Sequence, residues 1–233
     1  MREFSHKYIF LFSVVMVVVV AVFLSLAATL LQPRQQKNLE VEKKKSMLES
    51  IGISSTPETT ESLYDKYIGQ SFVLNSSGEE VAGVNAFTVD LREEQKKPLD
   101  QQNLPVFRAE PDDGEKVIII PVQGKGLWGP IWGYVSLKSD MNTIYGVTFD
   151  HKGETPGLGA EINTTPFESM FKGKKIFEEG KFVSIGVLKG GARRDDPHNV
   201  DAISGGTITS KGLQKMLLDG IGKYSEYLLK NKS

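Results

Sequence analysis

The most chemically suggestive segment lies near the carboxyl end and reads Asp201-Ala202-Ile203-Ser204-Gly205-Gly206-Thr207-Ile208-Thr209-Ser210. A run from Lys211 to Lys230 follows, with apolar residues at helical spacing, and Thr209 or Ser210 is well placed to cap its first turn. Glycines ahead of a helix leave backbone N–H groups free to meet an anion, and the helix dipole favours negative charge there. The segment therefore suits a phosphate, although the same residues also describe an ordinary loop that ends in an N-cap.

This segment resembles the flavinylation motif of FMN-binding proteins, Asp-x-x-Ser/Thr-Gly-Ala-Thr. In that family the last threonine carries FMN through a phosphoester bond, and Thr207 holds its place here. Gly206 stands where the family usually has alanine. Because the missing methyl removes no reacting group, the resemblance still implies covalent attachment at Thr207.

Two further loops combine glycine with residues that suit a planar ligand. Glu154-Thr155-Pro156-Gly157-Leu158-Gly159 contains a Pro-Gly turn whose backbone N–H groups could approach a flavin ring, or it is a plain tight turn. In Gly124-Lys125-Gly126-Leu127-Trp128-Gly129-Pro130, Trp128 offers a broad apolar face to the ring, or it anchors the core. Glu154 could tune the flavin electrostatically, or it is a solvated turn residue.

The same two loops resemble a narrower family, the C subunit of the sodium-translocating NADH:quinone oxidoreductase. The loop with Trp128 resembles the Gly-x-Gly-Leu-Trp segment of that family, and the loop with Glu154 resembles its Glu-Thr-Pro-Gly-Leu-Gly segment. The G subunit of the related Rnf electron-transport complex shares the Thr-Pro-Gly-Leu-Gly loop and the flavinylation motif, but the Leu-Trp segment is not expected there. The resemblance covers nearly the whole chain.

This resemblance implies a function, a cofactor and partners. The chain is expected to be a translocase subunit with a covalent FMN, installed from FAD by a flavin transferase in the presence of magnesium. Electrons would pass from an iron–sulfur centre of subunits D and E to the covalent FMN of the B subunit, within a complex that also contains subunits A and F and exports sodium. The expected cofactor-binding residues are Asp201, Ser204, Gly205, Gly206, Thr207, Thr209, Ser210, Glu154, Thr155, Gly157, Leu158, Gly159, Leu127 and Trp128. The alternatives are an Rnf-type G subunit and an assembly subunit without flavin, which only Gly206 favours.

The amino-terminal segment predicts a membrane anchor. No charged residue occurs from Tyr8 to Leu31, a length of about 36 Å as a helix and enough to cross a hydrocarbon core of about 30 Å. A signal peptide has a shorter apolar core, although Ala27-Ala28-Thr29 could mimic a cleavage site. We therefore expect a single transmembrane helix at 8–31, after a cytoplasmic segment at 1–7.

Two signals disagree about the orientation of the helix, the count of basic residues and the family resemblance. Arg2, His6 and Lys7 precede it, whereas Arg34, Lys37 and the Lys43–Lys45 triplet follow, so a count of basic residues places the large domain in the cytoplasm. That rule is weak for long domains. The family resemblance implies a bacterial inner-membrane protein with its soluble domain on the periplasmic side.

Composition excludes several other classes of protein. The chain has no cysteine, so it cannot ligate an iron–sulfur cluster through thiolates or form a disulfide. Its three histidines, His6, His151 and His198, lack the short spacing of a metal site, so no metal is expected. A formal net charge of −1 without a basic stripe argues against a nucleic-acid partner.

The remaining chain predicts a stalk or linker at 32–61 and one α+β domain at 62–233. Expected strands at 72–74 and 81–89 form a hairpin, and further strands lie at 117–122, 131–137, 143–149 and 182–188. A short helix is expected near 165–171 and the terminal helix at 211–230. We therefore expect a largely antiparallel sheet packed against helices.

Overall fold

The computed structural model describes residues 5–193 and 195–232 and divides into two compact units, Met1–Lys43 and Lys44–Ser233. Arg2 and most of the predicted segment 1–7 lie outside the described residues. Helix α1 (His6–Ser50) contains the whole predicted span 8–31, and among the described residues it alone is long and apolar enough to cross a membrane. It continues through Pro33 and the charged stalk, and its last turn, with Met47 and Leu48 buried, belongs to the second unit.

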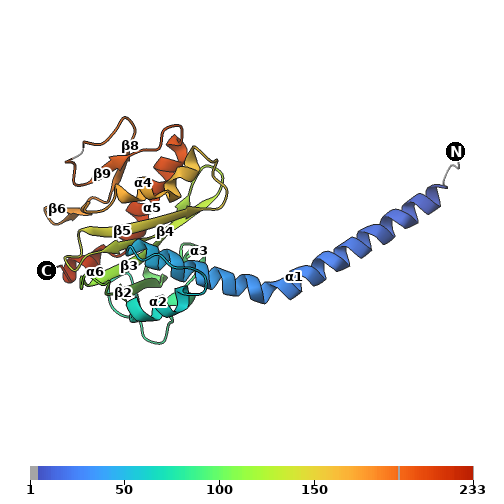
Figure 1. Cartoon of the computed structure of the whole chain (residues 1–233), viewed down its shortest axis with the longest axis horizontal. Helices are drawn as coiled ribbons and strands as arrows, with labels where there is room; N and C mark the ends of the chain where they lie inside the picture. Colours follow the sequence, from blue (N-terminus) through green and yellow to red (C-terminus); the bar gives the residue numbers. More distant parts are fainter. Residues whose placement is uncertain (1–4, 194, 233) are drawn as a thin grey trace. The chain divides into compact units, whose positions relative to one another are not determined.

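The second unit is built on a five-stranded antiparallel sheet, as the sequence predicts (Figure 1). Each strand pairs with the next one along the chain, in the order β1-β2-β3-β4-β5. The strands are β1 (Gln70–Leu74), β2 (Leu104–Ala109), β3 (Val117–Lys125), β4 (Pro130–Leu137) and β5 (Ile144–His151). This meander brings the β3–β4 turn and the end of β5 to the same edge, because Lys125 pairs with Pro130 and Ile131 with His151.

The central strands bury both faces of the sheet. Along β3, Ile118 and Ile120 pack in one apolar cluster with α5 (Thr207–Gly222), whereas Val117 and Ile119 pack in the other with Met47. This split follows from the two-residue period of side chains along a strand. In Figure 1, α4 (Thr165–Ser169) and α5 lie on one side of the sheet and α2 (Thr60–Tyr67) on the other. Because both faces of the sheet are covered, side chains on both faces of β3 are apolar, and its sequence is a continuous apolar run.

Short elements complete the second unit. Between β1 and β2 the chain forms the 3-10 helix η1 (Ala86–Thr88), α3 (Leu91–Glu94) and η2 (Leu99–Gln101), and η3 (Gly159–Asn163) follows β5. After α4 come two small sheets and the last two helices: β6 (Phe177–Glu178) with β7 (Lys181–Phe182), β8 (Gly186–Leu188) parallel to β9 (Asn199–Asp201), then α5 and α6 (Ser225–Lys230).

Two of the predicted strands are wrong. The partner of β1 is β2, not residues 81–89, which contain η1 and no strand. An isolated bridge joins Leu74 to Glu80, just before that range. The predicted strand 182–188 divides into β7 and β8, because Ser184 lies between them with a φ of 62° that a strand cannot hold. In both places the alternating apolar residues that predicted a strand lie in a loop and pack against the core from there.

The terminal helix also differs from its prediction. It begins at Thr207 rather than Lys211, and the residues at 223 and 224 separate it into α5 and α6. Gly206 occupies the N-cap position without a side-chain cap, so neither Thr209 nor Ser210 caps the helix. Both hydroxyls lie inside the first turn and are buried.

Glu168 on α4 makes the stability of this unit depend on pH. Burial raises the pKa of its carboxyl to about 7, with Glu49 and Asp150 adding to the rise and a hydrogen bond from the Phe149 N–H opposing it. Because this pKa is raised above its value of 4.5 in the unfolded chain, ionisation costs the folded state more, and stability falls as pH rises from 4.5 through 7.

We therefore expect Glu168→Gln to stabilise the protein at about pH 8.5 and to change little at about pH 4.5. The amide oxygen can still accept the Phe149 N–H, and water screening of the partly exposed group leaves about 1–2 kcal/mol to gain. Thermal unfolding of the full chain in detergent across this range measures it, with Glu110→Gln, an exposed carboxyl, as the matched control. An equal pH dependence in Glu168→Gln and the parent would contradict the assignment.

Candidate functional site

The buried carboxylate of Glu154 joins three segments that are distant in sequence. Its side chain is 4 % exposed. Oε1 accepts a hydrogen bond of 2.8 Å from the Trp128 N–H in the β3–β4 turn, and Oε2 accepts one of 2.6 Å from the Thr209 hydroxyl on α5. Its own N–H donates to His151 Nδ1 at 3.2 Å. Glu154 is therefore not a solvated turn residue, and it holds the two predicted flavin loops against the start of α5.

Two glycines let these segments approach the carboxylate. A Cβ at Gly126 would lie 2.5 Å from Glu154 Oε1, and one at Gly159 would lie 2.5 Å from both Glu154 Oε2 and the Thr209 hydroxyl. A side chain at either position would therefore have to displace the Glu154 carboxyl group from its hydrogen bonds. One glycine in each of the two loop motifs, Gly126 and Gly159, is thus favoured by packing around Glu154.

The flavinylation-like motif forms the turn that leads into α5. Gly205 has a φ of +74°, which favours glycine, and a side chain there would also collide with Leu158. The hydroxyl of Ser210 accepts a hydrogen bond of 3.1 Å from the Ile203 N–H and closes the turn. A Cβ on Gly206, the position of the family's alanine, would lie 3.0 Å from Ile203 Cγ2 and 3.2 Å from its Cβ. Ile203 would have to shift slightly to admit alanine there.

Thr207 is the first residue of α5 and is half-buried. Its hydroxyl makes no hydrogen bond within the described part of the chain, and no side chain caps the helix. The first N–H groups of a helix have no intrahelical partner and point outward from its positive end. A phosphate esterified to Thr207 would therefore meet free backbone donors at the end of a sixteen-residue helix.

Exposed apolar side chains belong to the same three segments. Trp128 is 69 % exposed, and Ile208, the neighbour of Thr207, is 57 % exposed. Leu127 and Leu158 are also largely exposed. Trp128 is therefore no core anchor. An apolar aromatic ring covering these side chains would remove them from water, so the chemistry of the residues present fits the isoalloxazine of a flavin.

The other predicted site residues lie in the same loops. Thr155 accepts through its carbonyl from the N–H groups of Leu158 and Ala160, and the Gly157 N–H donates to Glu161 at 3.0 Å. Ser204 is exposed beside Gly205. Asp201 ends β9 and accepts from the Ala192 N–H at 2.5 Å, so its carboxylate orders the preceding loop. All the predicted residues thus belong to the segment from the end of β9 to the first turn of α5, to the β3–β4 turn or to the chain that follows β5.

Sequence reasoning missed His151, Gly126 and Ile208 as parts of this site. Within the described residues, no three His, Cys, Asp or Glu side chains gather in a way that could hold a metal ion. The direct bond between Glu154 and Thr209 was not foreseen, because 55 residues separate the two in sequence. The signal for this bond is the burial of the Glu154 carboxyl group, which then needs hydrogen-bond donors, but the sequence does not reveal burial.

The comparisons with known proteins point to one family. The FMN-binding domain family matches residues 126–222, which include all three segments of the site. The chain is 34 % identical to the Na(+)-translocating NADH-quinone reductase C subunit of Vibrio vulnificus, over 84 % of this chain and 83 % of that protein. It is 31 % identical to the protein of the same name from Haemophilus ducreyi, over 89 % and 87 % of the two chains.

Solved structures of proteins from the same family are also similar to this chain. The crystal structure of the Na(+)-translocating NADH-quinone reductase C subunit from Parabacteroides distasonis is 43 % identical, covers 85 % of this chain and 96 % of its own, and has a TM-score of 0.78. The crystal structure of Shewanella oneidensis NqrC is 28 % identical, covers 81 % and 97 %, and has a TM-score of 0.69. The predicted fold class, an antiparallel sheet with packed helices after an apolar helix, is confirmed.

The bond between Glu154 and Thr209 generates a stability prediction. Thr209→Val removes the hydroxyl that donates to Oε2 and leaves a buried carboxylate oxygen without this partner, which costs about 1–3 kcal/mol. Urea unfolding of the full chain in detergent measures the loss. Thr165→Val, which deletes an exposed threonine hydroxyl, is the matched control and should change stability by less than about 0.5 kcal/mol. Equal unfolding midpoints for both variants would remove Glu154 from its linking role.

Proposed function

Because this chain belongs to the family of the Na(+)-translocating NADH-quinone reductase C subunit, we propose that it carries electrons through an FMN bound covalently to Thr207. The observation that carries the proposal is the position of Thr207 at the uncapped start of α5. When bound, the flavin supplies transfer of one electron at a time between neighbouring redox centres. The protein's own residues attach the cofactor, orient it and set its surroundings.

Attachment through the phosphate uses the turn before α5. Thr207 provides the oxygen of the phosphoester, and the free N–H groups of the first helical turn can bind the remaining phosphate oxygens. Gly205 and Gly206 carry no side chains that would cover this helix end. Covalent linkage keeps the flavin at an effective concentration that does not depend on the surrounding pool, which suits a site outside the cytoplasm.

The attachment reaction requires a separate enzyme. Within the described residues, the Thr207 hydroxyl is hydrogen-bonded to no base that could remove its proton. A flavin transferase using FAD and magnesium would join the hydroxyl oxygen to the phosphorus of the FMN part. The pyrophosphate bond then breaks, AMP leaves, and the hydroxyl proton passes to the transferase or to water. Asp201, Ser204 and Gly205 are exposed and could be contacted by that enzyme.

The two loops that Glu154 holds would orient the isoalloxazine ring of FMN. The exposed faces of Leu127, Trp128 and Leu158 offer apolar contact, and Thr155, Gly157 and Gly159 shape the loop beside it. Glu154 is satisfied by Trp128 and Thr209, so its part in the site is to position the loops. Thr209 and Ser210 have the same supporting part, because their hydroxyls bond within the protein.

The proposed electron path and partners come from the family resemblance. Electrons would enter from an iron–sulfur centre of subunits D and E and leave to the covalent FMN of the B subunit, in a complex with subunits A and F. An Rnf-type G subunit is the alternative in the same functional class, and the Leu127-Trp128 segment together with relatives named as the C subunit favours the sodium-translocating enzyme. The second alternative, an assembly subunit without flavin, is supported only by Gly206. At that position Ile203 leaves little room for the methyl group of the family's usual alanine.

Thr207→Ala tests the attachment. In a host that supplies the transferase, the parent should show a fluorescent flavin band in a denaturing gel, and Thr207→Ala should lose it because no oxygen remains for the ester. Thr209→Val is the matched control and should keep the band, since its hydroxyl bonds to Glu154. A band in Thr207→Ala would place the flavin elsewhere, and a parent without any band would favour the assembly subunit.

The topology is tested separately. We propose a bacterial inner-membrane anchor with the soluble domain on the periplasmic side, supported by the apolar part of α1 and the family resemblance. A reporter active only outside the cytoplasm should be active when fused after Ser233 and inactive at the amino terminus. The reverse pattern would mean that Arg34, Lys37 and the Lys43–Lys45 triplet set the orientation.

A further inference from the structure

Lys211 follows Thr207 by one helical turn on α5, inside the segment that matches the FMN-binding domain family. Residues four apart on a helix are neighbours on its surface, with Cβ atoms about 5–6 Å apart. Thr209, Ser210 and Leu213 are buried against the rest of the unit. Thr207 is half-buried and Lys211 is exposed, so these two residues share the side of the helix that faces solvent.

The ammonium group of Lys211 has no partner within the described part of the chain. No hydrogen bond or ion pair joins it to another described residue. The positions three and four residues away on the helix hold no acid: they are Thr207, Ile208, Gln214 and Lys215. The first turn of α5 also contains no acidic residue, although acids are stabilising at that end of a helix. The start of α5 thus offers backbone donors and a cation without a fixed anion.

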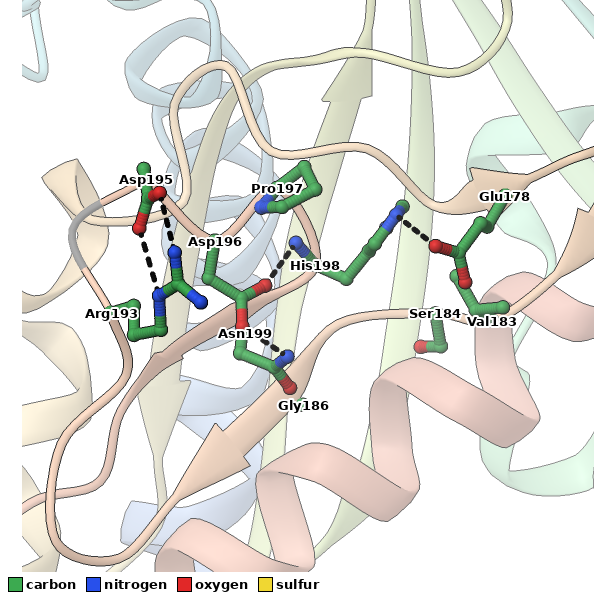
Figure 2. Close-up of a pocket in the computed structure, with 10 residues that line it drawn as sticks. All are labelled: Glu178, Val183, Ser184, Gly186, Arg193, Asp195, Asp196, Pro197, His198 and Asn199. Carbon is green, nitrogen blue, oxygen red and sulfur yellow. Dashed lines mark hydrogen bonds and ion pairs between the residues drawn. The ribbon is translucent and has the colours of Figure 1, made fainter.

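Two other cations close to the motif are already paired. Arg193 lies in the loop before β9, on the rim of a pocket of about 600 Å³, and Figure 2 shows its guanidinium against Asp195. Its Nε and Nη2 donate to the two carboxylate oxygens at 3.2 and 2.8 Å. Lys215, one turn beyond Lys211, pairs with Asp219 at 2.7 Å. Lys211 differs from both because its charge is available to a ligand.

A phosphate on Thr207 would carry its charge as far along the side chain as a glutamate does. In the ester, the path from Cα to a charged oxygen passes through Cβ, Oγ1 and phosphorus. In glutamate it passes through Cβ, Cγ and Cδ, which is the same number of bonds. An acid followed by a lysine four residues later is the favourable order on a helix, because it also agrees with the helix dipole. An esterified Thr207 followed by Lys211 reproduces that order.

The chain already contains an ion pair of this kind on α6. Glu226 precedes Lys230 by four residues, and Lys230 Nζ lies 3.8 Å from Glu226 Oε2. Both side chains are exposed, as Lys211 is. A lysine at this spacing and in this order therefore reaches the charged end of a side chain one turn before it.

We propose that Lys211 is the counter-ion of the FMN phosphate on Thr207 and thus a further cofactor-binding residue. This inference rests on the proposed attachment of FMN to Thr207. The free N–H groups of the first helical turn bind phosphate oxygens at the helix end, and Lys211 pairs with the phosphate from the side that faces solvent. The phosphate end of the flavin is then held by α5, while the loops joined by Glu154 orient the ring.

Thr207→Glu tests the pairing without any flavin. In the full chain in detergent, Lys211→Met should raise the unfolding equilibrium constant about twofold more in the Thr207→Glu background than in the parent, the effect of one exposed helical ion pair. Urea unfolding of the parent, both single variants and the double variant measures the difference. Sodium chloride at about 1 M should remove it, because salt screens exposed charges. Lys116→Met, which deletes an exposed lysine ahead of β3, should have the same effect in both backgrounds.

The loaded protein tests the contact with the cofactor itself. A chain with FMN esterified at Thr207 contains a single phosphorus, whose NMR signal can be followed in phospholipid-free detergent. Lys211→Met should shift this signal, because the phosphate loses a charged donor. Lys211→Arg keeps a charged donor and should leave the signal closer to that of the parent, and Lys116→Met should not move it. Flavin fluorescence in a denaturing gel confirms that the compared samples are equally loaded.

Either experiment can overturn the proposal. It is wrong if Lys211→Met has the same effect on unfolding in both backgrounds, or if the phosphorus signal of the loaded protein is unchanged by Lys211→Met. A parent chain that carries no flavin would instead contradict the proposed function. In that case the Thr207→Glu comparison still decides whether Lys211 pairs with an anion at this position, so the two failures are distinguishable.

Discussion

The arrangement of the candidate flavin site depends on one buried carboxyl group, that of Glu154. A buried polar group is costly unless hydrogen-bond partners replace the lost hydration, and the partners of the Glu154 oxygens within the described structure are both hydrogen-bond donors. Its donors are a backbone N–H of the β3–β4 turn and a hydroxyl of α5. Three segments must therefore meet at one point for the fold to be stable, and Gly126 and Gly159 leave the space in which they do.

This constraint determines where chemistry can take place. Thr209 is turned inward to Glu154 and Ser210 is turned inward to Ile203. Thr207, at the first position of α5, is left with a hydroxyl that makes no hydrogen bond to any residue that the structure describes. The two buried hydroxyls define the rotation of the helix about its axis. Thr207, the proposed attachment residue, is thus distinguished from its neighbours by packing as well as by its place in the motif.

The remainder of the unit supports this arrangement. The meander sheet brings the β3–β4 turn and the end of β5 to one edge, and its apolar face holds α5 through Leu213, Met216 and Leu217. Strand β9, which pairs in parallel with β8, then leads the chain into the motif. Burial on both faces makes the sheet a rigid base for loops that are exposed at their tips.

The sequence by itself determined the apolar span, the antiparallel α+β class and the central strands, and it singled out the three segments of the candidate site. These follow from local signals, because hydrophobic periodicity and glycine-rich turns are properties of neighbouring residues. It could not place β2 beside β1, start α5 at Thr207, or distinguish a buried Glu154 from a solvated one. Tertiary structure decided these, because a carboxylate 55 residues from its hydroxyl partner, and a strand that pairs across a long loop, depend on which surfaces are buried together.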